Sequence, residues 1–411
     1  MNARIALILT TFPQLSETFI VNKFVSLLDK GWDIHIVCSN FSKNNWTTFD
    51  SLRNHPELRK RIHQSPPTSS KILAALLYLP ILLLTFFVYP ARVWRYFRIG
   101  GGIHGLSIFR KFYIDAPLIW LNPHVIHFEF GALAVGRETL AKCIGCKMVV
   151  SFRGYDLNFS GLEDPNYYRE IWKYADGLHF LGEDLWARAL RRGCPADKLK
   201  ALIPPALDTE LFKPANERNL NEDIGSVSRP LRLLSVGRLE WKKGYEFAIQ
   251  AIRILIDNGI ACEYRIIGEG QFSTAIAFAR HQLQLDDTVH FLGFRTREQI
   301  IAQYAWADIF IHTAVSEGFC NAVLEAQAMQ IPVVCTDADG LAENVAVGIS
   351  GFVVARRNPQ AVASKVKLLI ESPKLRDQMG KAGRKRVILK FQLENQANQF
   401  SDFYTQVLKA K

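Results

Sequence analysis

The sequence predicts an α/β protein made of two doubly wound domains that face a cleft. Its 411 residues exceed one ordinary domain, since a domain typically holds about 150 residues. Short apolar runs alternate with amphipathic helical segments, which is typical of parallel sheets covered by helices. A passage rich in Asn, Glu and Asp, residues 216–228, separates two such series. We interpret it as part of a linker between the domains.

The composition is that of a folded protein with an anionic partner. Apolar residues make up 49% of the chain and aromatic residues 11%, which excludes disorder over most of its length. The formal net charge of +11 indicates a nucleotide, a nucleic acid or an acidic lipid surface. Charge alone does not distinguish these partners.

The cysteine pattern predicts a reducing compartment. The seven cysteines are odd in number and scattered, and we expect no secretory signal because Pro13 follows the short apolar run 5–9. Cys143 and Cys146 form a lone C-x-x-C without a second pair at zinc spacing. We therefore expect buried thiols here rather than a metal or redox site.

The first domain is expected over residues 1–205. Ser16 is a candidate N-cap of a helix that follows the first strand and ends at Gly31. The loop before this helix lies at the carboxyl end of a parallel strand, where ligands bind, so Ser16 and Glu17 either contact a substrate or cap the helix. The expected strands are residues 4–10, 33–39, 125–128, 148–152, 177–181 and 201–203.

Residues 72–91 carry no charge and are almost entirely apolar. About 20 such residues can span a bilayer, but a single crossing would separate strands that must pair. Pro80 interrupts the run and indicates two short helices. Arginines and aromatic residues flank it, as in segments that dock on anionic membranes. We expect residues 72–98 to dock on a membrane surface, and burial as a helical pair is the alternative.

The second domain is expected over residues 229–392, after a linker at 206–228. Its first strand ends in V-G-R-L-E-W-K-K-G, where Gly237 permits a tight turn. Arg238 and Lys243 can converge there on one anion, although exposed salt bridges explain them equally well. The expected strands are residues 231–236, 264–267, 289–292, 309–312, 333–336 and 352–354.

Two carboxylates flank a predicted helix start within residues 316–330. Glu317 lies in a Gly-containing loop, and Glu325 lies in a short helix that opens near Asn321. A helix N-terminus favours a phosphate, and carboxylates can bind sugar hydroxyls. The stretch therefore indicates a nucleotide-sugar site.

These motifs resemble those of retaining glycosyltransferase family 4, which has the GT-B fold of two Rossmann-like domains. The resemblance rests on G-R-L-E-W-K-K-G, G-E-G, F-L-G-F, S-E-G-F-C-N-A-V-L-E-A and D-G-L-A-E. It covers almost all of the second domain and parts of the first. The opening T-F-P-Q-L-S-E-T-F-I looks like the subset that builds colanic-acid-type exopolysaccharides and capsules.

The resemblance implies a division of labour at the donor site. Arg238 and Lys243 would hold the donor diphosphate and stabilise the leaving group. Glu317 would bind hydroxyls of the donor sugar, and Glu325 would bind those of the ribose. The nucleobase would lie near Phe294. The remaining implied donor contacts are Gly237, Gly268, Gly318, Phe319, Cys320 and Asn321.

The first domain departs from the family pattern on the acceptor side. Arg153 and Glu129 stand where histidines are common. Arg153 would act as a fixed cation, because it cannot titrate near neutrality. His127 is either the acceptor-side base or a hydrogen-bonded structural histidine. Asp156 either caps the next turn or orients Arg153.

The implied reaction is sugar transfer, with retained configuration, from a UDP- or GDP-linked sugar. The acceptor would be a saccharide, with a growing lipid-linked saccharide expected, in exopolysaccharide, capsule or lipopolysaccharide synthesis. We expect neither a metal nor another cofactor, and no nucleic-acid partner. The enzyme would lie in the cytoplasm, bound peripherally to the inner membrane face. A final helix, residues 393–411, would cross back to the first domain.

Other interpretations of the same residues remain. Two carboxylates suit a hydrolase, but that chemistry needs no Arg/Lys pair. Asp337 and Asp339 have D-x-D spacing, which can hold a metal in another glycosyltransferase fold. A nucleotide-sugar epimerase, a phosphorylase and a degenerate non-catalytic subunit are the alternatives within the same fold.

Overall fold

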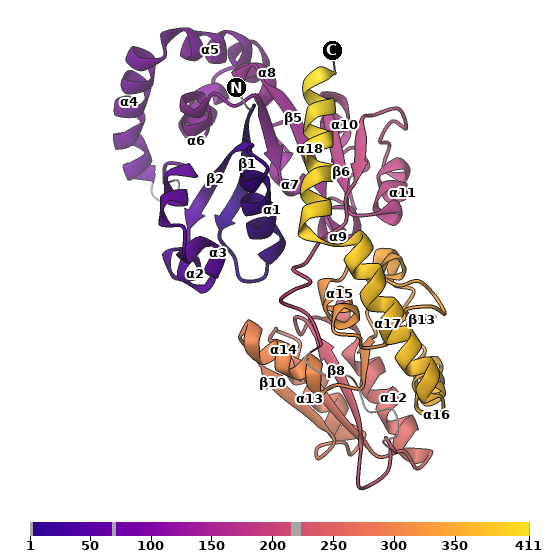
Figure 1. Cartoon of the computed structure of the whole chain (residues 1–411). Helices are drawn as coiled ribbons and strands as arrows, with labels where there is room; N and C mark the ends of the chain where they lie inside the picture. The colour runs from indigo at the N-terminus through magenta and orange to yellow at the C-terminus, as the bar shows by residue number, and fades with distance from the viewer. Residues whose placement is uncertain (1–2, 68–70, 215–222, 411) are drawn as a thin grey trace. The chain divides into compact units, whose positions relative to one another are not determined.

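The computed structural model describes residues 3–67, 71–214 and 223–410, which form two compact units. Unit 1 comprises Met1–Ile203 together with Gln396–Lys411, and unit 2 comprises Pro204–Asn395. Each unit is an α/β domain with helices on both sides of a sheet (Figure 1). Much of the expected linker is outside the described residues, namely 215–222.

Unit 1 contains a seven-stranded sheet in the order β3-β2-β1-β4-β5-β6-β7. Neighbouring strands pair in parallel throughout this sheet. Every strand expected in this domain is present, with ends shifted by at most a few residues. The short edge strand β3 was not predicted, since its sequence I-H-Q lacks an apolar run. The strands are β1 (Arg4–Phe12), β2 (Asp33–Phe41), β3 (Ile62–Gln64), β4 (Val125–Phe128), β5 (Lys147–Phe152), β6 (Gly177–Phe180) and β7 (Lys200–Leu202).

Helices surround this sheet, and the last helix of the chain completes its core. Phe400, Phe403, Tyr404 and Val407 of α18 are buried against the sheet and α1. The helices are α1 (Thr18–Asp29), α2 (Lys43–Thr48), α3 (Asp50–Arg53), η1 (Pro56–Arg61), α4 (Lys71–Val88), α5 (Pro90–His104), α6 (Ser107–Leu121), α7 (Gly131–Ala134), α8 (Leu140–Ile144), α9 (Gly154–Asn158), α10 (Arg169–Tyr174), α11 (Glu183–Arg191) and α18 (Leu393–Lys409).

The apolar segment forms one helix, α4, at the periphery of unit 1 (Figure 1). The prediction that Pro80 divides it was wrong. A proline removes one backbone hydrogen bond, and α4 tolerates this loss where the neighbouring Leu76 and Leu79 are exposed. The break comes instead at Tyr89, because Pro90 disfavours a helical residue before it and starts α5.

Among the described residues, none of the helices has by itself the length and apolar character needed to cross a membrane. Residues Ile72–Val88 and Pro90–His104 meet the criterion of length and composition only as a pair, and the pair is bent by 117°.

Unit 2 contains a six-stranded sheet in the order β10-β9-β8-β11-β12-β13. Its pairings are parallel, and every expected strand is present. The strands are β8 (Leu231–Val236), β9 (Cys262–Ile267), β10 (Val289–Gly293), β11 (Ile309–His312), β12 (Val333–Thr336) and β13 (Gly351–Val354). The helices are η2 (Trp241–Lys243), α12 (Tyr245–Asp257), α13 (Ser273–Gln282), α14 (Arg297–Trp306), α15 (Asn321–Ala328), η3 (Asp339–Asn344), α16 (Pro359–Glu371) and α17 (Pro373–Lys390).

Part of the segment expected to be a linker is packed in unit 2. Leu207 and Phe212 are buried in one of its apolar clusters. Leu207 also forms a bridge with Gln392. Apolar residues near the start of the expected linker therefore anchor the chain to unit 2 soon after β7.

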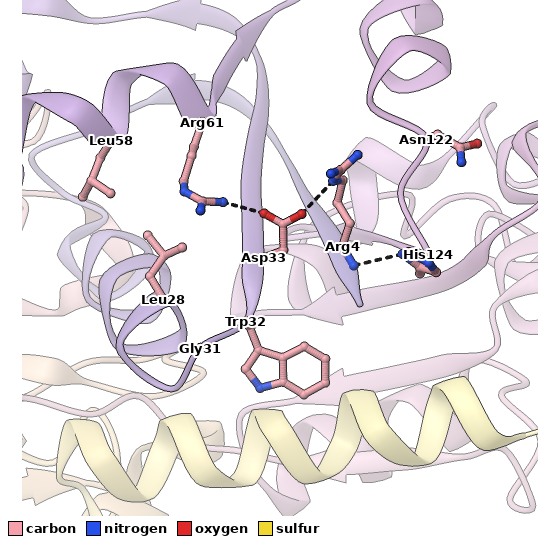
Figure 2. Close-up of a pocket in the computed structure, with 9 residues that line it drawn as sticks. All are labelled: Arg4, Leu28, Gly31, Trp32, Asp33, Leu58, Arg61, Asn122 and His124. Carbon is pink, nitrogen blue, oxygen red and sulfur yellow. Dashed lines mark hydrogen bonds and ion pairs between the residues drawn. The ribbon is translucent and has the colours of Figure 1, made fainter. Parts of the chain in front are cut away.

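A pocket of unit 1 lies at the amino ends of β1 and β2 (Figure 2). Asp33 lies at its centre between Arg4, 2.8 Å away, and Arg61, 2.6 Å away. Ligands of parallel sheets bind beyond the carboxyl ends of the strands. This pocket is at the opposite edge, and its arginines are already paired with Asp33.

Candidate active site

Two loops meet beyond the carboxyl ends of β8 and β11, which are parallel neighbours. The Val315 N–H donates to the Lys242 carbonyl oxygen at 2.8 Å, and the Thr313 hydroxyl donates to that of Gly244 at 2.8 Å. Gly244 has a φ of +60°, and a Cβ there would clash with the Thr313 carbonyl. Glycine at this position therefore lets the two loops touch.

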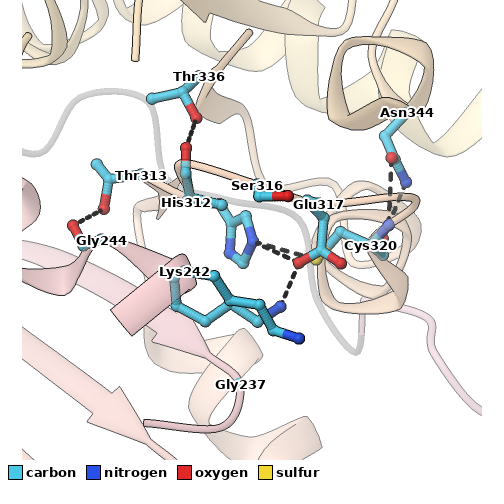
Figure 3. Close-up of polar contacts among 12 residues, drawn as sticks. Gly237, Lys242, Gly244, His312, Thr313, Ser316, Glu317, Cys320, Thr336 and Asn344 are labelled. Carbon is cyan, nitrogen blue, oxygen red and sulfur yellow. Dashed lines mark hydrogen bonds and ion pairs between the residues drawn. The ribbon is translucent and has the colours of Figure 1, made fainter. Parts of the chain in front are cut away.

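This contact brings Lys243 to Glu317. Lys243 Nζ forms a short ion pair with Glu317 Oε2, and the two side chains are only 12% and 15% exposed. His312, at the end of β11, places Nε2 3.5 Å from the same oxygen. Figure 3 shows His312, Glu317 and Cys320 directed toward one another. The family resemblance assigned both loops to one donor site, but nothing in the sequence indicated the part played by His312.

The charges of this cluster stabilise each other. Burial favours the neutral form of Glu317, but Lys243 and His312 lower the pKa of its carboxyl to about 2. Burial opposes protonation of His312, but Cys320 and Glu317 raise the pKa of its imidazole to about 9. Glu317 is therefore a carboxylate between two cations near neutrality. In such a cluster Lys243 can exchange its contact with the carboxylate for a bound phosphate, and Glu317 can accept a hydrogen bond from a sugar hydroxyl.

Arg238 lies on the same β8 loop but does not share this burial. Its side chain is 62% exposed, and its guanidinium is 2.7 Å from Glu240 Oε1. Glu240 also pairs with Lys242 at 3.1 Å. The exposed salt bridge that the sequence left open is thus present. The guanidinium is accessible to an anion that competes with Glu240.

Glu325 lies in α15 and has a tyrosine as partner. The Tyr304 hydroxyl donates to Glu325 Oε2 at 2.8 Å and also contacts the Ala322 carbonyl oxygen at 3.2 Å. Burial raises the pKa of the Glu325 carboxyl. Tyr304 fixes the orientation of this carboxylate. Sequence reasoning missed Tyr304, which is on α14 and is separated from Glu325 by β11.

The start of α15 is the expected one, but its first N–H groups are partly used within the protein. α15 begins at Asn321, with Cys320 as N-cap. The Cys320 N–H donates to Asn344 Oδ1 at 3.3 Å, and Asn344 returns a bond to the Cys320 carbonyl oxygen at 2.9 Å. The main chain at Gly318 also touches Gly340, where a Cβ would clash with the Gly318 carbonyl. Phe319, which lies between Gly318 and Cys320 in the chain, is partly buried.

The loops after β8, β9 and β10 also approach one another. The Gly237 N–H donates to the Ile267 carbonyl oxygen at 2.9 Å, and the Gly268 N–H donates to that of Gly293 at 3.0 Å. Gly268 has a φ of +138°, and a Cβ there would clash with the Gly237 carbonyl. Phe294 follows at the edge and is 56% exposed. Bare backbone and an exposed ring therefore border the loops that carry Arg238 and Lys243.

The D-x-D pair has a partner within the protein. Arg356 lies 3.1 Å from Asp337 Oδ1 and 3.1 Å from Asp339 Oδ1. The Ser316 hydroxyl also donates to Asp339 at 2.6 Å. An arginine thus occupies the place between the two carboxylates that a metal ion would need, and the pair fixes the loop before Glu317.

His127, which the family resemblance assigns to the acceptor side, is buried and hydrogen-bonded at both ring nitrogens. Its Nδ1 is 2.7 Å from the Tyr404 hydroxyl oxygen, and its Nε2 is 2.7 Å from Ser151 Oγ. The side chain has no exposed surface. Burial and the nearby Lys23 lower the pKa of His127 well below its usual value, so its ring is neutral. The structure favours the hydrogen-bonded structural role over that of a base.

Arg153 and Glu129 belong to a buried ion cluster with Lys23. Lys23 Nζ is 2.5 Å from Glu129 Oε1, and an Arg153 guanidinium nitrogen is 2.9 Å from Oε2. Burial lowers the pKa of Lys23 to about 8, although Glu129 opposes this shift. Glu129 is fully buried. Arg153 also lies over the Phe19 ring, 4.1 Å from its centroid.

Lys23 was missed because it is in an amphipathic helix, where lysine usually faces water. Its place among the apolar positions was visible, since Lys23 follows Ile20 by three residues and precedes Leu27 by four. All three side chains are buried. A lysine on the apolar face of a predicted helix is therefore a usable signal for a buried ion pair.

Asp156 caps the helix that follows Arg153, which is the first of the two roles expected for it. Its carboxylate accepts from the Arg153 N–H at 2.9 Å and from the Ala132 N–H at 2.9 Å. Ser16 is not the N-cap that we expected. Because α1 starts at Thr18, Glu17 occupies the N-cap position, without a side-chain capping bond. Ser16 is exposed in the preceding loop.

Residues 216–386 match the family model described as glycosyl transferases group 1. The chain is 27% identical over 377 residues to the putative colanic acid biosynthesis glycosyltransferase WcaL of Escherichia coli K12, which covers 88% of this chain and 89% of that protein. It is 27% identical over 368 residues to the amylovoran biosynthesis glycosyltransferase AmsK of Erwinia amylovora, covering 86% and 87%.

Solved structures share the fold at low sequence identity. Sucrose-phosphate synthase from Thermosynechococcus elongatus aligns over 100% of both chains, with a TM-score of 0.73 and 17% identity. Anabaena HepE in complex with UDP-glucose aligns over 98% of this chain and 100% of its own, with a TM-score of 0.68 and 15% identity. The chain therefore has the GT-B fold, carries a glycosyl transferases group 1 domain and is a glycosyltransferase.

Proposed function

We propose that this glycosyltransferase moves a sugar from a nucleotide-diphosphate sugar to a growing lipid-linked saccharide in exopolysaccharide, capsule or lipopolysaccharide synthesis. We further propose that the transfer retains the anomeric configuration and needs no metal. One observation carries the proposal: the partly exposed Lys243–Glu317 ion pair lies beyond the strand ends of unit 2. The names of the relatives support the polymer class.

The diphosphate would be held by cations from the β8 loop. Arg238 is exposed and can leave Glu240 for a phosphate, and Lys243 lies where the same anion can reach it. The guanidinium offers a planar fork, and the ammonium acts as a mobile point charge. Both would stabilise negative charge on the departing diphosphate, an effect that often dominates catalysis. A pair of protein cations can supply this charge without a metal.

The two carboxylates would bind different hydroxyl groups of the donor. Glu317 would accept from hydroxyls of the transferred sugar, close to Lys243. Glu325, oriented by Tyr304, would accept from the ribose hydroxyls. HepE has been solved with UDP and with UDP-glucose, which supports a UDP-linked donor, and a GDP-linked donor remains an alternative.

The acceptor would be bound by unit 1 near Arg153. This side chain is 11% exposed and is held by Glu129 and by the Phe19 ring. A fixed guanidinium suits a phosphate or hydroxyl of the acceptor. The neutral, buried His127 would support this region rather than accept a proton.

The exposed surface of α4 would dock the enzyme on the inner face of the cytoplasmic membrane. Apolar side chains emerge from much of this helix, while Tyr78 and Thr85 hold it to unit 1 through aromatic contacts and a 2.8 Å bond with Trp120. Trp94 of α5 carries Arg98 over its ring, a pair that suits a lipid headgroup region. The exposed apolar residues of α4 are Ile72, Leu73, Leu76, Leu79, Leu83, Leu84, Phe86, Phe87 and Val88.

A panel of nucleotide sugars, with and without lipid-linked acceptor, tests the reaction through nucleoside-diphosphate release. We expect release that depends on acceptor, and its loss in Arg238→Ala and Glu325→Ala variants. Conversion of the sugar without acceptor would indicate an epimerase, and a requirement for inorganic phosphate would indicate a phosphorylase. Donor binding without turnover would indicate a non-catalytic subunit. Unchanged turnover in either variant would contradict the site.

Sedimentation with anionic vesicles tests the docking surface. We expect binding that weakens at high salt and that falls in a Leu76→Asp, Phe87→Asp double variant. Substitution of the exposed Leu389 of unit 2 by Asp is a matched control. Equal binding to neutral vesicles, or an unaffected double variant, would contradict docking by α4.

A further inference from the structure

The side chains of His312, Glu317 and Cys320 converge at the end of β11. Each offers one metal-binding atom, and these atoms lie within 4.8 Å of one another. We propose that this triad binds a thiophilic divalent cation of the zinc class, and that the bound cation blocks the donor site. The blocking step rests on the proposed function, whereas the binding step does not.

The two distances from the His312 imidazole to the other ligand atoms match a tetrahedral centre. His312 Nε2 is 3.5 Å from Cys320 Sγ and 3.5 Å from Glu317 Oε2. Zn–N bonds of about 2.05 Å, Zn–O bonds of about 2.1 Å and Zn–S bonds of about 2.3 Å at tetrahedral angles place N and S about 3.6 Å apart, and N and O about 3.4 Å apart. The imidazole is thus placed, relative to the thiol and the carboxylate, as the ligands of a small tetrahedral ion would be.

The ligand chemistry selects the class of ion. A thiolate, a neutral imidazole and one carboxylate form a mixed set that suits zinc and related ions, whereas magnesium and calcium require mainly oxygen ligands. Binding would therefore release to solvent the protons that Cys320 and His312 carry in the metal-free protein. His312 and Cys320 are nearly buried, at 2% and 4% exposure. Glu317 is the most exposed of the three, at 15%, so an ion would enter past its carboxylate.

Lys243 sets the consequence of binding. Its ammonium group forms the short ion pair with Glu317 Oε2, and a dication bound to Glu317 would repel it. Metal binding would therefore displace Lys243 and occupy Glu317, the two groups proposed to bind the diphosphate and the sugar. The ion would act as an exchangeable inhibitor that competes with the nucleotide sugar, not as a cofactor.

Cobalt titration of the full-length protein tests the site without reference to activity. We expect one Co²⁺ per chain, with ligand-field bands of a tetrahedral site and a thiolate-to-cobalt charge-transfer band, both removed by Zn²⁺. Cys320→Ser should abolish the charge-transfer band and weaken Zn²⁺ binding by about 100-fold, since even changes outside the ligand set cost 10- to 100-fold. Cys262→Ser is the matched control, because Cys262 is a partly buried thiol of the same unit. This variant should keep the bands.

Lys243→Met distinguishes this site from adventitious thiol binding. Loss of the competing ammonium should strengthen Zn²⁺ binding by about tenfold or more, because a neighbouring positive charge no longer opposes the ion. The site would be refuted if the folded protein showed no thiolate band at saturating Co²⁺. It would equally be refuted if Cys320→Ser bound zinc as tightly as the wild-type protein.

Calorimetric titration with UDP and with GDP tests the blocking step. One equivalent of Zn²⁺ should weaken nucleotide binding to the wild-type protein but not to Cys320→Ser, a comparison that corrects for zinc bound by the nucleotide itself. Unchanged nucleotide affinity in zinc-loaded protein would overturn the block. If no nucleotide bound to metal-free protein, the proposed function would fail while the cobalt bands would still decide the metal site.

Discussion

Glu317 in unit 2 and Glu129 in unit 1 are both held by a lysine and a second cation, but in different surroundings. Glu317 contacts Lys243 and His312 and retains 15% exposure. Glu129 contacts Lys23 and Arg153 and is completely buried. A carboxylate at an open strand end can exchange a partner for a ligand, whereas a completely buried carboxylate such as Glu129 cannot contact one and serves to hold its two cations in place.

The seal in unit 1 comes from the far end of the chain. Lys23 Nζ lies 3.9 Å from the centroid of the Phe400 ring, and Tyr404 contacts His127. Both aromatic residues belong to α18. The sealed cluster therefore joins α1, the segment after β4 and the final helix, and its expected contribution is to stability.

The largest effect on activity is predicted for the open cluster. Lys243→Met should lower kcat/KM by about 10²- to 10³-fold, because loss of one preorganised charge at a reacting group typically costs about 3–4 kcal/mol. Its melting temperature should change little. Steady-state kinetics with the active donor provide the measurement. Lys242→Met is the matched control, since Lys242 pairs with Glu240 instead, and an equal loss there would contradict the special role of Lys243.

The sealed cluster should respond in stability. Glu129→Gln leaves two buried cations without their carboxylate, which is expected to cost about 3–5 kcal/mol of unfolding free energy. Denaturant unfolding followed by circular dichroism provides the measurement. Glu170→Gln serves as control, because Glu170 makes only an exposed pair with Lys173. A Glu129 variant as stable as this control would mean that the buried pair adds nothing to the fold.

Asp33 is a third carboxylate held by two cations, and the pH dependence of folding stability tests its contribution. Burial would raise its pKa, but hydrogen bonds from Arg4 and Arg61 lower it to about 2 in the folded state, against about 3.9 in an unfolded chain. The folded state then binds fewer protons, so this stabilisation is present above pH 4 and is lost as the pH falls toward 2. After allowance for solvent screening, we expect Asp33→Asn to cost about 1–2 kcal/mol at pH 7.

That deficit should shrink between pH 4 and pH 2, as measured by denaturant unfolding at each pH. Asp50→Asn, which removes an exposed pair with Arg53, should show no comparable pH dependence. A deficit for Asp33→Asn that stayed constant down to pH 2 would contradict the lowered pKa.

The smallest effect is expected for Tyr304→Phe. Loss of one hydrogen bond to Glu325 should weaken nucleotide binding by about 3- to 10-fold, measured by calorimetry. Tyr264→Phe removes a buried hydroxyl that bonds Ser235 instead, and it should leave the affinity unchanged. Equal effects of the two variants on nucleotide affinity would mean that Tyr304 has no special part in ribose binding.

The sequence was sufficient for every strand of the two sheets except the edge strand β3, because apolar runs mark buried parallel strands. The family resemblance also assigned Lys243 and Glu317 to one donor site, and both residues follow strands that are neighbours in the sheet. The partners His312 and Tyr304 could not be predicted, because their roles depend on tertiary packing of separate elements. Lys23 was missed and Pro80 was misjudged because tertiary context overrides the usual preference of a residue. Lys23 pairs with a buried carboxylate, whereas Pro80 lies on an exposed part of α4.

The central claim is that the open cluster of unit 2, and not the sealed cluster of unit 1, binds the donor. Calorimetric titration of Glu317→Gln and Glu129→Gln with the nucleotide sugar that the wild-type protein binds tests it most directly, under conditions where both variants are folded. We predict that Glu317→Gln binds about 10- to 100-fold more weakly and that Glu129→Gln keeps the wild-type affinity. Wild-type affinity in Glu317→Gln would contradict the claim.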